Sequence, residues 1–186
     1  MADRTGCASA GTAWGGMTMK DMMPNTKEKI YGAEYVTRQV TVSGRVNQPL
    51  VLTVDDLRKM EGAEVAGLTM ICGTGRKKGV IDSYRGVLLS AVLDRADIIL
   101  REHHSPNWTY VTLASSDGHW ALFSWHEIFN SPVGERAVVV FERNGLPLDE
   151  KEGEIGFISG NDGRTGPRRL RYLRHIGVHE LARPEE

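Results

Sequence analysis

The chain has little of what several classes of protein require. Its 186 residues include only two cysteines, Cys7 and Cys72, which excludes a disulfide-rich secreted scaffold. No apolar run is longer than a handful of residues, whereas a transmembrane helix needs about 20. The formal net charge at pH 7 is −1, so the molecule as a whole does not attract polyelectrolytes. Any anion-binding site must therefore come from a local asymmetry of charge.

The composition is otherwise that of an ordinary globular protein. Forty per cent of the residues are hydrophobic and 25% are charged, which excludes wholesale disorder. Residues 1–30 are rich in Gly, Ala, Thr and Met without a sustained period, so we expect a flexible tail there and one domain over residues 31–183. The tail has neither the apolar core of a signal peptide nor a twin-arginine motif. We expect a cytoplasmic protein as the sequence is written, and a periplasmic one if an export signal was trimmed.

The pattern of the remaining residues predicts an α+β fold that is predominantly β. Capping boxes at Thr53–Asp56 and Ser124–Glu127 predict the starts of two short helices, and apolar residues at helical spacing predict a third over residues 88–96. The order of elements does not alternate regularly, which argues against a doubly wound parallel sheet. We expect about seven strands, at residues 36–46, 64–71, 108–115, 119–123, 137–142, 154–159 and 176–179.

Several motifs suggest chemistry but fit poorly. Gly73-Thr74-Gly75 follows a strand as a dinucleotide-binding loop would, but no amphipathic helix opens after it. His175 and His179 have the spacing of a zinc pair on a helix, but Gly177 and the β-branched neighbours favour a strand, so we expect two ordinary histidines. We expect Trp120 and Trp125 to be core residues rather than a stacking platform.

Cys72 is the first feature with a specific chemical interpretation. It ends an apolar strand and precedes a loop that carries Arg76, Lys77 and Lys78. Nearby positive charge lowers the pKa of a thiol and favours the thiolate, which binds metals and attacks electrophiles. The alternative is an inert buried cysteine.

The second feature is a run of arginines near the end of the chain. Residues 163–179 contain no Asp or Glu, and glycines in the same loop could turn backbone N–H groups toward an anion. Guanidinium groups match the geometry of phosphate, so the run could bind a phosphate group. The alternative is that these arginines form a solvated basic face without a ligand. No aromatic residues are interleaved in the loop, so we expect no nucleic-acid partner. The arginines are Arg164, Arg168, Arg169, Arg171 and Arg174.

A series of short motifs, taken in order, resembles one family. The sequence is similar over residues 36–179 to the molybdopterin-binding domain of the sulfite oxidase family in its stand-alone form. The individual motifs are weak, but their joint order and spacing are fairly specific. They are Val42 to Val46 with Pro49-Leu50, Leu52 to Leu57, Met70 to Gly73, Tyr84 to Leu89, Ser116 to Gly118, Asn144 to Leu148 and Arg164 to Leu173.

The resemblance implies a molybdenum cofactor, in which a pterin dithiolene carries the metal and a phosphate. Cys72 occupies the position of the family's cysteine ligand to molybdenum, and a soft thiolate suits a sulfur-rich metal centre. Arg169 and Arg171 fall where the family holds the pterin phosphate, and Ser115 or Ser116 lies near another family contact. The full set of cofactor-binding residues implied is Cys72, Gly73, Thr74, Arg76, Ser115, Asn161, Arg164, Arg168, Arg169 and Arg171.

The sequence also departs from the family pattern. Thr74-Gly75-Arg76 stands where Asn-Arg often follows the cysteine, and Gly156 replaces a common arginine. No segment matches the family's C-terminal dimerisation domain or a haem domain, so the family's substrate is not carried over. The leading hypothesis is an oxidoreductase performing two-electron oxygen-atom transfer on a small substrate, with an unidentified electron-transfer partner and no membrane span. The basic loop could attract an anionic substrate.

Two other functions remain open from the sequence. One is a pterin-binding or carrier module without turnover, which the altered loop favours and an intact Cys72 disfavours. The other is an interaction domain that uses its basic patch and holds no cofactor. The molybdenum and pterin content of the purified protein separates the interaction domain from the oxidoreductase and the carrier module.

Overall fold

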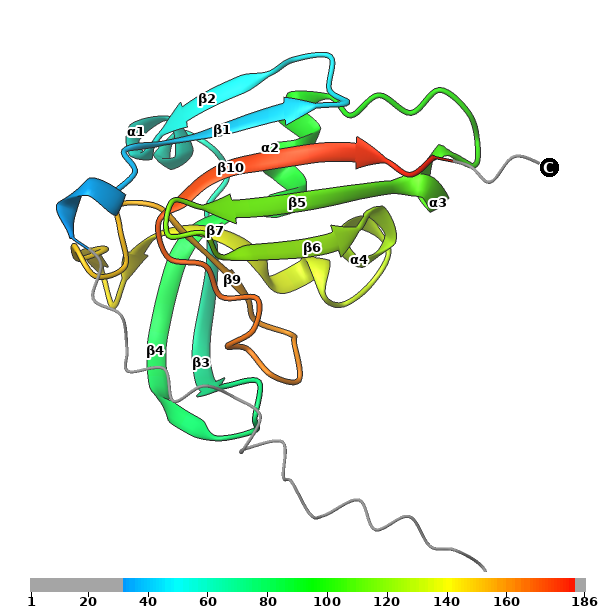
Figure 1. Cartoon of the computed structure of the whole chain (residues 1–186). Helices are drawn as coiled ribbons and strands as arrows, with labels where there is room; N and C mark the ends of the chain where they lie inside the picture. The colour runs from blue at the N-terminus through cyan, green and yellow to red at the C-terminus, as the bar shows by residue number, and fades with distance from the viewer. Residues whose placement is uncertain (1–31, 183–186) are drawn as a thin grey trace, which may run out of the picture.

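Two five-stranded sheets make up most of the described chain (Figure 1). The structure is a computed structural model and describes residues 32–182. The expected N-terminal tail, with Cys7, lies outside the described residues. The first sheet has the order β2-β1-β10-β5-β6, with β1 and β10 parallel and the other pairs antiparallel. Its strands are β1 (Gln39–Gly44), β2 (Leu50–Thr53), β5 (Thr109–Ser115), β6 (Trp120–Ser124) and β10 (Leu173–Glu180).

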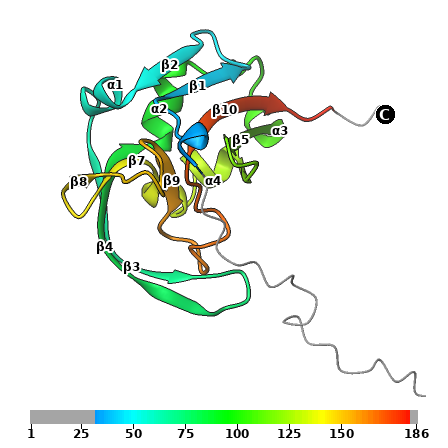
Figure 2. The same ribbon diagram turned by 60° about the vertical axis from the view of Figure 1, so that its left-hand side comes forward.

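The second sheet is antiparallel and ends in a long hairpin. Its order is β3-β4-β7-β8, and β9 also pairs with β7. The hairpin of β3 and β4 extends beyond the first sheet, as Figure 2 shows, and this extension positions the site described below. The strands are β3 (Ala63–Ile71), β4 (Lys77–Leu88), β7 (Ala137–Arg143), β8 (Leu146–Pro147) and β9 (Gly156–Ser159).

The helices are short and lie at the ends of strands. Both predicted capping boxes are confirmed: the side chains of Thr53 and Ser124 each accept a hydrogen bond from the third backbone N–H of the helix that follows. The predicted amphipathic helix is also confirmed as α2. The helices are α1 (Val54–Arg58), α2 (Leu89–Ala96), α3 (Ser105–Trp108) and α4 (Trp125–Phe129), with 3-10 turns η1 (Ala33–Tyr35) and η2 (Gly134–Arg136).

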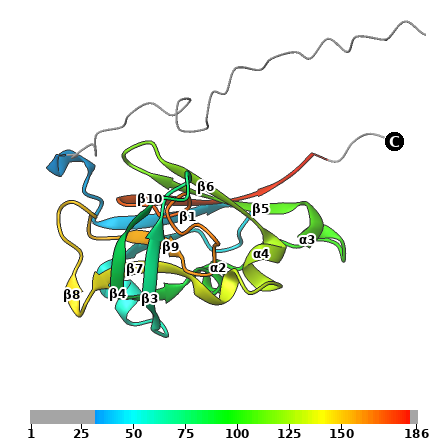
Figure 3. The same ribbon diagram turned by 90° about the horizontal axis from the view of Figure 1, so that it is seen from below.

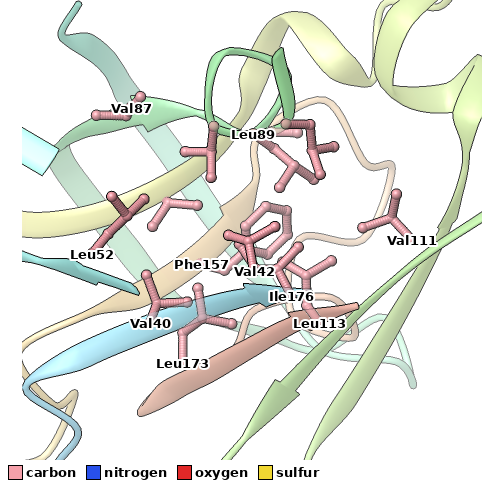
Figure 4. Packing of buried hydrophobic residues seen from close by; sticks show 14 of the residues in the cluster. Val40, Val42, Leu52, Val87, Leu89, Val111, Leu113, Phe157, Leu173 and Ile176 are labelled. Carbon is pink, nitrogen blue, oxygen red and sulfur yellow. The ribbon is translucent and has the colours of Figure 1, made fainter. Parts of the chain in front are cut away.

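The main core lies between the two sheets and is closed by α2. Inward-facing residues of the first sheet meet β9 and the start of α2, with Phe157 fully buried among them (Figure 4). The view from below in Figure 3 shows β1, β10 and β5 in one layer and β3, β4 and β7 in another. Because one face of the first sheet packs in this core, alternate residues of β5 and β10 point to its other face.

The predicted α+β fold with mostly β structure is confirmed, but several elements, β4, β8 and α3 among them, were not predicted. The twelve-residue strand β4 begins with Lys77 and Lys78, within a segment that the sequence assigns to a loop. Pairing of this end of β4 with β3 holds these residues in a strand, so tertiary contacts override weak local propensity. The single-turn helix α3 was also missed.

The expectation that Trp120 is a core residue is wrong. Its side chain is 61% exposed, because Trp120 and Leu122 point away from the core whereas Ala121 and Phe123 point into it. Among the described residues no helix is both long and apolar enough to cross a membrane.

Candidate functional site

Cys72 follows the last residue of β3 and opens the turn of the β3–β4 hairpin. Its backbone N–H donates to the carbonyl of Arg76 at 3.0 Å, and the N–H of Gly75 donates to the Cys72 carbonyl at 2.8 Å. These two bonds close a tight turn whose last residues, from Thr74 onward, are exposed. The Cys72 side chain is half-buried and forms no disulfide within the described residues. The thiol is therefore accessible on a backbone that is fixed on both sides.

The surroundings of Cys72 favour its thiolate form. The Cys72 Sγ lies 2.9 Å from the Thr74 Oγ1, and this hydrogen bond is the main cause that lowers the pKa of the thiol below its ordinary value of 9.0. Burial opposes the shift, while backbone N–H groups and the charge of Lys78 add to it. The prediction of a thiol with a lowered pKa beside a basic loop is thus supported, although the nearest hydroxyl contributes more than any single charge.

The segment between β9 and β10, residues 160–172, carries most of the arginine run and is called the arginine loop here. It packs directly on the end of β3, which is an edge strand. The Thr165 hydroxyl donates to the Thr69 carbonyl at 2.9 Å and accepts from the Ile71 N–H at 3.2 Å. The Gly166 N–H donates to the Ile71 carbonyl at 2.8 Å. A Cβ on Gly166 would lie 2.7 Å from that carbonyl oxygen and 3.1 Å from the Cys72 Cα, so only glycine allows this approach. Figures 1 and 2 show the loop, in orange, beside the β3–β4 hairpin.

Arg164 links the two loops that the sequence singled out separately. Its guanidinium donates to the carbonyl of Gly73, next to Cys72, and its side chain is exposed. Pro167 also lies near Gly73, since a Cβ on Gly73 would be 3.8 Å from the Pro167 Cγ. The structure therefore brings Cys72, Gly73, Thr74 and Arg164 together.

Arg168 is held by protein carboxylates instead. It donates to Asp162 at 2.5 and 2.8 Å and to Glu127 at 2.9 Å, and its guanidinium lies 3.9 Å from the centre of the Phe123 ring. Both acids lie outside the acid-free run of residues 163–179. The local excess of positive charge is therefore smaller than the sequence indicates.

Arg169 belongs to a buried network. It donates to the Tyr84 hydroxyl at 2.9 Å and to the Glu152 carboxylate, which also accepts from Arg143 at 3.1 Å. Glu152 is 7% exposed, and burial raises the pKa of the Tyr84 hydroxyl. The arginine that the resemblance assigns to the phosphate thus already neutralises a buried carboxylate.

Two other arginines of the run lie apart from Cys72's immediate contacts. Arg171 is half-buried and donates to the Lys151 carbonyl at 3.4 Å, while Arg174 is exposed on β10. Arg76, Lys77 and Lys78 are exposed along the hairpin. Of the basic residues that the sequence singled out, those of the hairpin and Arg164 are therefore the exposed ones nearest Cys72.

Ser115 and Asn161 have different surroundings. The Ser115 Oγ is buried and has no hydrogen-bond partner among the described residues. Its backbone N–H donates to the His119 carbonyl at 2.9 Å, and the His119 Nε2 lies 3.1 Å from the Pro167 carbonyl, so the β5–β6 turn touches the arginine loop. Asn161 instead donates to the Pro132 carbonyl at 2.5 Å, away from these contacts. Sequence analysis missed His119, which no motif signals.

The site is an open surface made by three loops. Two surface cavities lie elsewhere, one lined by residues of α2 and α4 and the other by residues of α1, and neither includes Cys72. Within residues 32–182 no group of three or more His, Cys, Asp or Glu side chains could hold a metal ion. A metal at Cys72 would thus take one thiolate from the protein and its other ligands from a cofactor.

Replacing Thr74 tests the cause of the lowered thiol pKa. In a Cys7→Ser background, Thr74→Val should raise the pKa of Cys72, because the thiolate loses its principal hydrogen bond. The pH at which iodoacetamide alkylation is half-maximal should shift upward. Thr41→Val, which removes a hydroxyl from β1, is the matched control and should leave the profile unchanged. Identical profiles for all three proteins would exclude the Thr74 hydroxyl as the cause.

Replacing Arg169 tests the buried network. Arg169→Ala should lower the free energy of unfolding by about 3 kcal/mol, because removing one partner leaves the charge of Glu152 undercompensated in the interior. Arg174→Ala, at an exposed position, should change it by less than about 0.5 kcal/mol. Urea unfolding of cofactor-free protein measures both. Equal stability of the two variants would mean that Arg169 does not hold the fold together.

Comparison with known families and structures places the site in context. The family model described as "Oxidoreductase molybdopterin binding domain" matches residues 30–154, which include Cys72 and Ser115 but not the arginine loop. A search of curated proteins finds no match. Among solved structures, the chain is similar to the crystal structure of the sulfane dehydrogenase SoxCD from Paracoccus pantotrophus, with a TM-score of 0.60 and 17% identity.

That similarity covers 77% of this chain and 38% of the SoxCD chain, so this chain spans less than half of its neighbour's length. At this identity the likeness concerns the fold alone. The family match covers about two thirds of the chain and includes β1 through β8. The chain therefore belongs to the oxidoreductase molybdopterin-binding domains of the sulfite oxidase family, whose cofactor is molybdopterin.

Proposed function

We propose that this chain is a molybdenum-cofactor oxidoreductase that transfers an oxygen atom to or from a small substrate, with Cys72 as the protein ligand of the metal. One observation carries the proposal: a half-buried thiol with a lowered pKa stands at a fixed hairpin end, and an exposed arginine binds the carbonyl of the next residue. A thiolate is the form that ligates a metal, so a lowered pKa reduces the cost of deprotonating Cys72 on binding.

Two features of the residues fit a molybdopterin. The thiol is the soft ligand that a sulfur-rich molybdenum centre takes, and the described residues contain no group of three or more His, Cys, Asp or Glu side chains that would hold the metal instead. The buried Ser115 Oγ, left without a partner, offers an unused donor and acceptor close to the β5–β6 turn. When bound, the cofactor supplies two-electron chemistry at molybdenum, while the protein holds and orients it.

The chain's own residues divide the remaining tasks. Arg164 has further N–H donors beyond the one that binds Gly73, and its exposed guanidinium is our candidate for the cofactor phosphate. Arg169 supports the loop from inside rather than binding the phosphate, because its charge is already paired with the buried Glu152 carboxylate. Gly73 and Thr74 shape the turn beside the metal ligand.

The exposed charge around the turn favours a small anionic substrate. No carboxylate among the described side chains forms an ion pair with Arg76, Lys77 or Lys78, whereas Arg168 and Arg169 are both neutralised. Positive groups that remain solvated raise the local concentration of anions. In the oxidative direction the substrate gains one oxygen atom derived from water, and two electrons and two protons leave, the electrons passing to a separate redox partner.

The Cys72→Ser variant tests turnover. Purified from a cofactor-competent host, it should keep the wild-type melting temperature of the cofactor-free protein but lose dye-linked activity, since an alkoxide is a far less available ligand than a thiolate. Sulfite and sulfoxides with artificial dyes serve as test substrates. Activity equal to that of the wild type would refute the ligand assignment. Wild-type protein that holds molybdenum and pterin but turns over no substrate would favour a carrier module.

The Arg164→Ala variant tests phosphate binding. A charge-assisted hydrogen bond contributes about 1.5–3 kcal/mol, so its loss should weaken cofactor binding by about 10- to 100-fold. Molybdenum content and fluorescence of the oxidised pterin measure occupancy per chain. Arg174→Ala removes an arginine of the same run on β10 and serves as the control. Equal occupancy in both variants would exclude Arg164 as a cofactor contact.

A further inference from the structure

The outer face of the first sheet carries a cluster of polar side chains that the proposed redox site does not use. On β10, Ile176 and Val178 pack in the core, and His175 and His179 lie on the opposite face with half-buried rings. Neighbouring strands contribute Ser43 from β1 and Thr112 from β5. Because β10 is the central strand of this sheet, both neighbours flank the histidines (Figure 1).

The two imidazole rings converge on one point above Gly177. A Cβ on Gly177 would lie 2.5 Å from the His179 Nε2 and 3.1 Å from the His175 Cε1. Four residues of an extended strand span about 13 Å, so strand geometry alone would keep these side chains apart. The rings lean toward each other over the one residue between them on this face. Gly177 lacks a side chain, which leaves the space that the two rings share.

Hydrogen bonds and stacking hold both rings in this arrangement. The His175 Nε2 lies 2.8 Å from the Ser43 Oγ, and the His179 Nε2 lies 2.9 Å from the Thr112 Oγ1. The Tyr110 ring stacks on His179 with centroids 5.0 Å apart and planes at 22°. Side chains that are fixed before binding lose less conformational entropy when a ligand arrives.

Each imidazole can offer a metal the lone pair of one ring nitrogen. The two rings over Gly177 therefore supply two nitrogen ligands from a single strand.

We propose that His175 and His179 form a site for a divalent transition-metal ion of the zinc class, with the hydroxyls of Ser43 and Thr112 beside it. Imidazole nitrogen suits Zn²⁺, Ni²⁺ and Cu²⁺, whereas Ca²⁺ and Mg²⁺ require oxygen ligands. Two protein nitrogens leave the remaining coordination positions to hydroxyls and water. The site is separate from Cys72, so it goes beyond the proposed oxidoreductase function and stands without it.

Zinc titration of the full-length chain tests the site. In a Cys7→Ser, Cys72→Ser background, which removes competing thiols, isothermal titration with ZnCl₂ should show one strong site per chain. His175→Asn and His179→Asn should each weaken its affinity by at least about tenfold, and the double variant should weaken it little further, because either substitution already breaks the chelate. The double variant His103→Ala, His104→Ala, which removes the adjacent histidines before α3, should bind zinc as its parent does.

Gly177→Ala is the most discriminating variant. It keeps both imidazoles but fills the space between them, and the atoms displaced are side-chain ends that can swing away, so the fold should persist by circular dichroism. Zinc affinity should fall by as much as in the histidine variants. Unchanged zinc affinity in folded Gly177→Ala would overturn the proposal. So would single histidine variants that reduce the number of zinc ions bound without weakening their affinity, because the two histidines would then bind zinc independently. Should Gly177→Ala fail to fold, the two asparagine variants and their double variant decide the question alone.

Discussion

The hydroxyl of Thr165 bridges two backbone groups on the outer edge of β3, and the candidate site at Cys72 is arranged around this contact. An edge strand leaves every second N–H and C=O without a partner, and here Thr165 and Gly166 satisfy those nearest Cys72. The contact also places Arg164 against Gly73. The hydrogen bonds that satisfy the edge of β3 thus also bring the residues of the candidate site together.

Arginines close together in the sequence carry out different tasks because their partners differ. Arg168 and Arg169 meet carboxylates from distant segments, while Arg164 stays exposed beside the thiol. The buried ion pairs fix the loop on which Arg164 stands, since a carboxylate such as Glu152 would be costly to bury without its cations. Arg168 and Arg169 therefore hold the loop in place, while Arg164 supplies its exposed charge.

Much of the fold could be predicted from local patterns. The capping boxes at Thr53 and Ser124, helix α2 and the position of Cys72 at a strand end all follow from near neighbours in the sequence. Strand β4 could not be predicted in the same way, because its basic first residues are held in a strand by pairing with β3. The sequence also showed that the arginine run lacks acids, but it could not show that Glu127 and Glu152 would fold against it. His175 and His179 looked ordinary because their convergence depends on Gly177 and on two hydroxyls from neighbouring strands.

The central claim is that the hairpin thiol is the protein's ligand to molybdenum. X-ray absorption at the molybdenum K edge addresses it directly, because the extended fine structure counts the sulfur atoms bound to the metal. Wild-type protein and Cys72→Ser, both loaded in a cofactor-competent host, should differ by one sulfur at molybdenum, with the dithiolene sulfurs retained in the variant. The same number of sulfur ligands in both proteins would contradict the account.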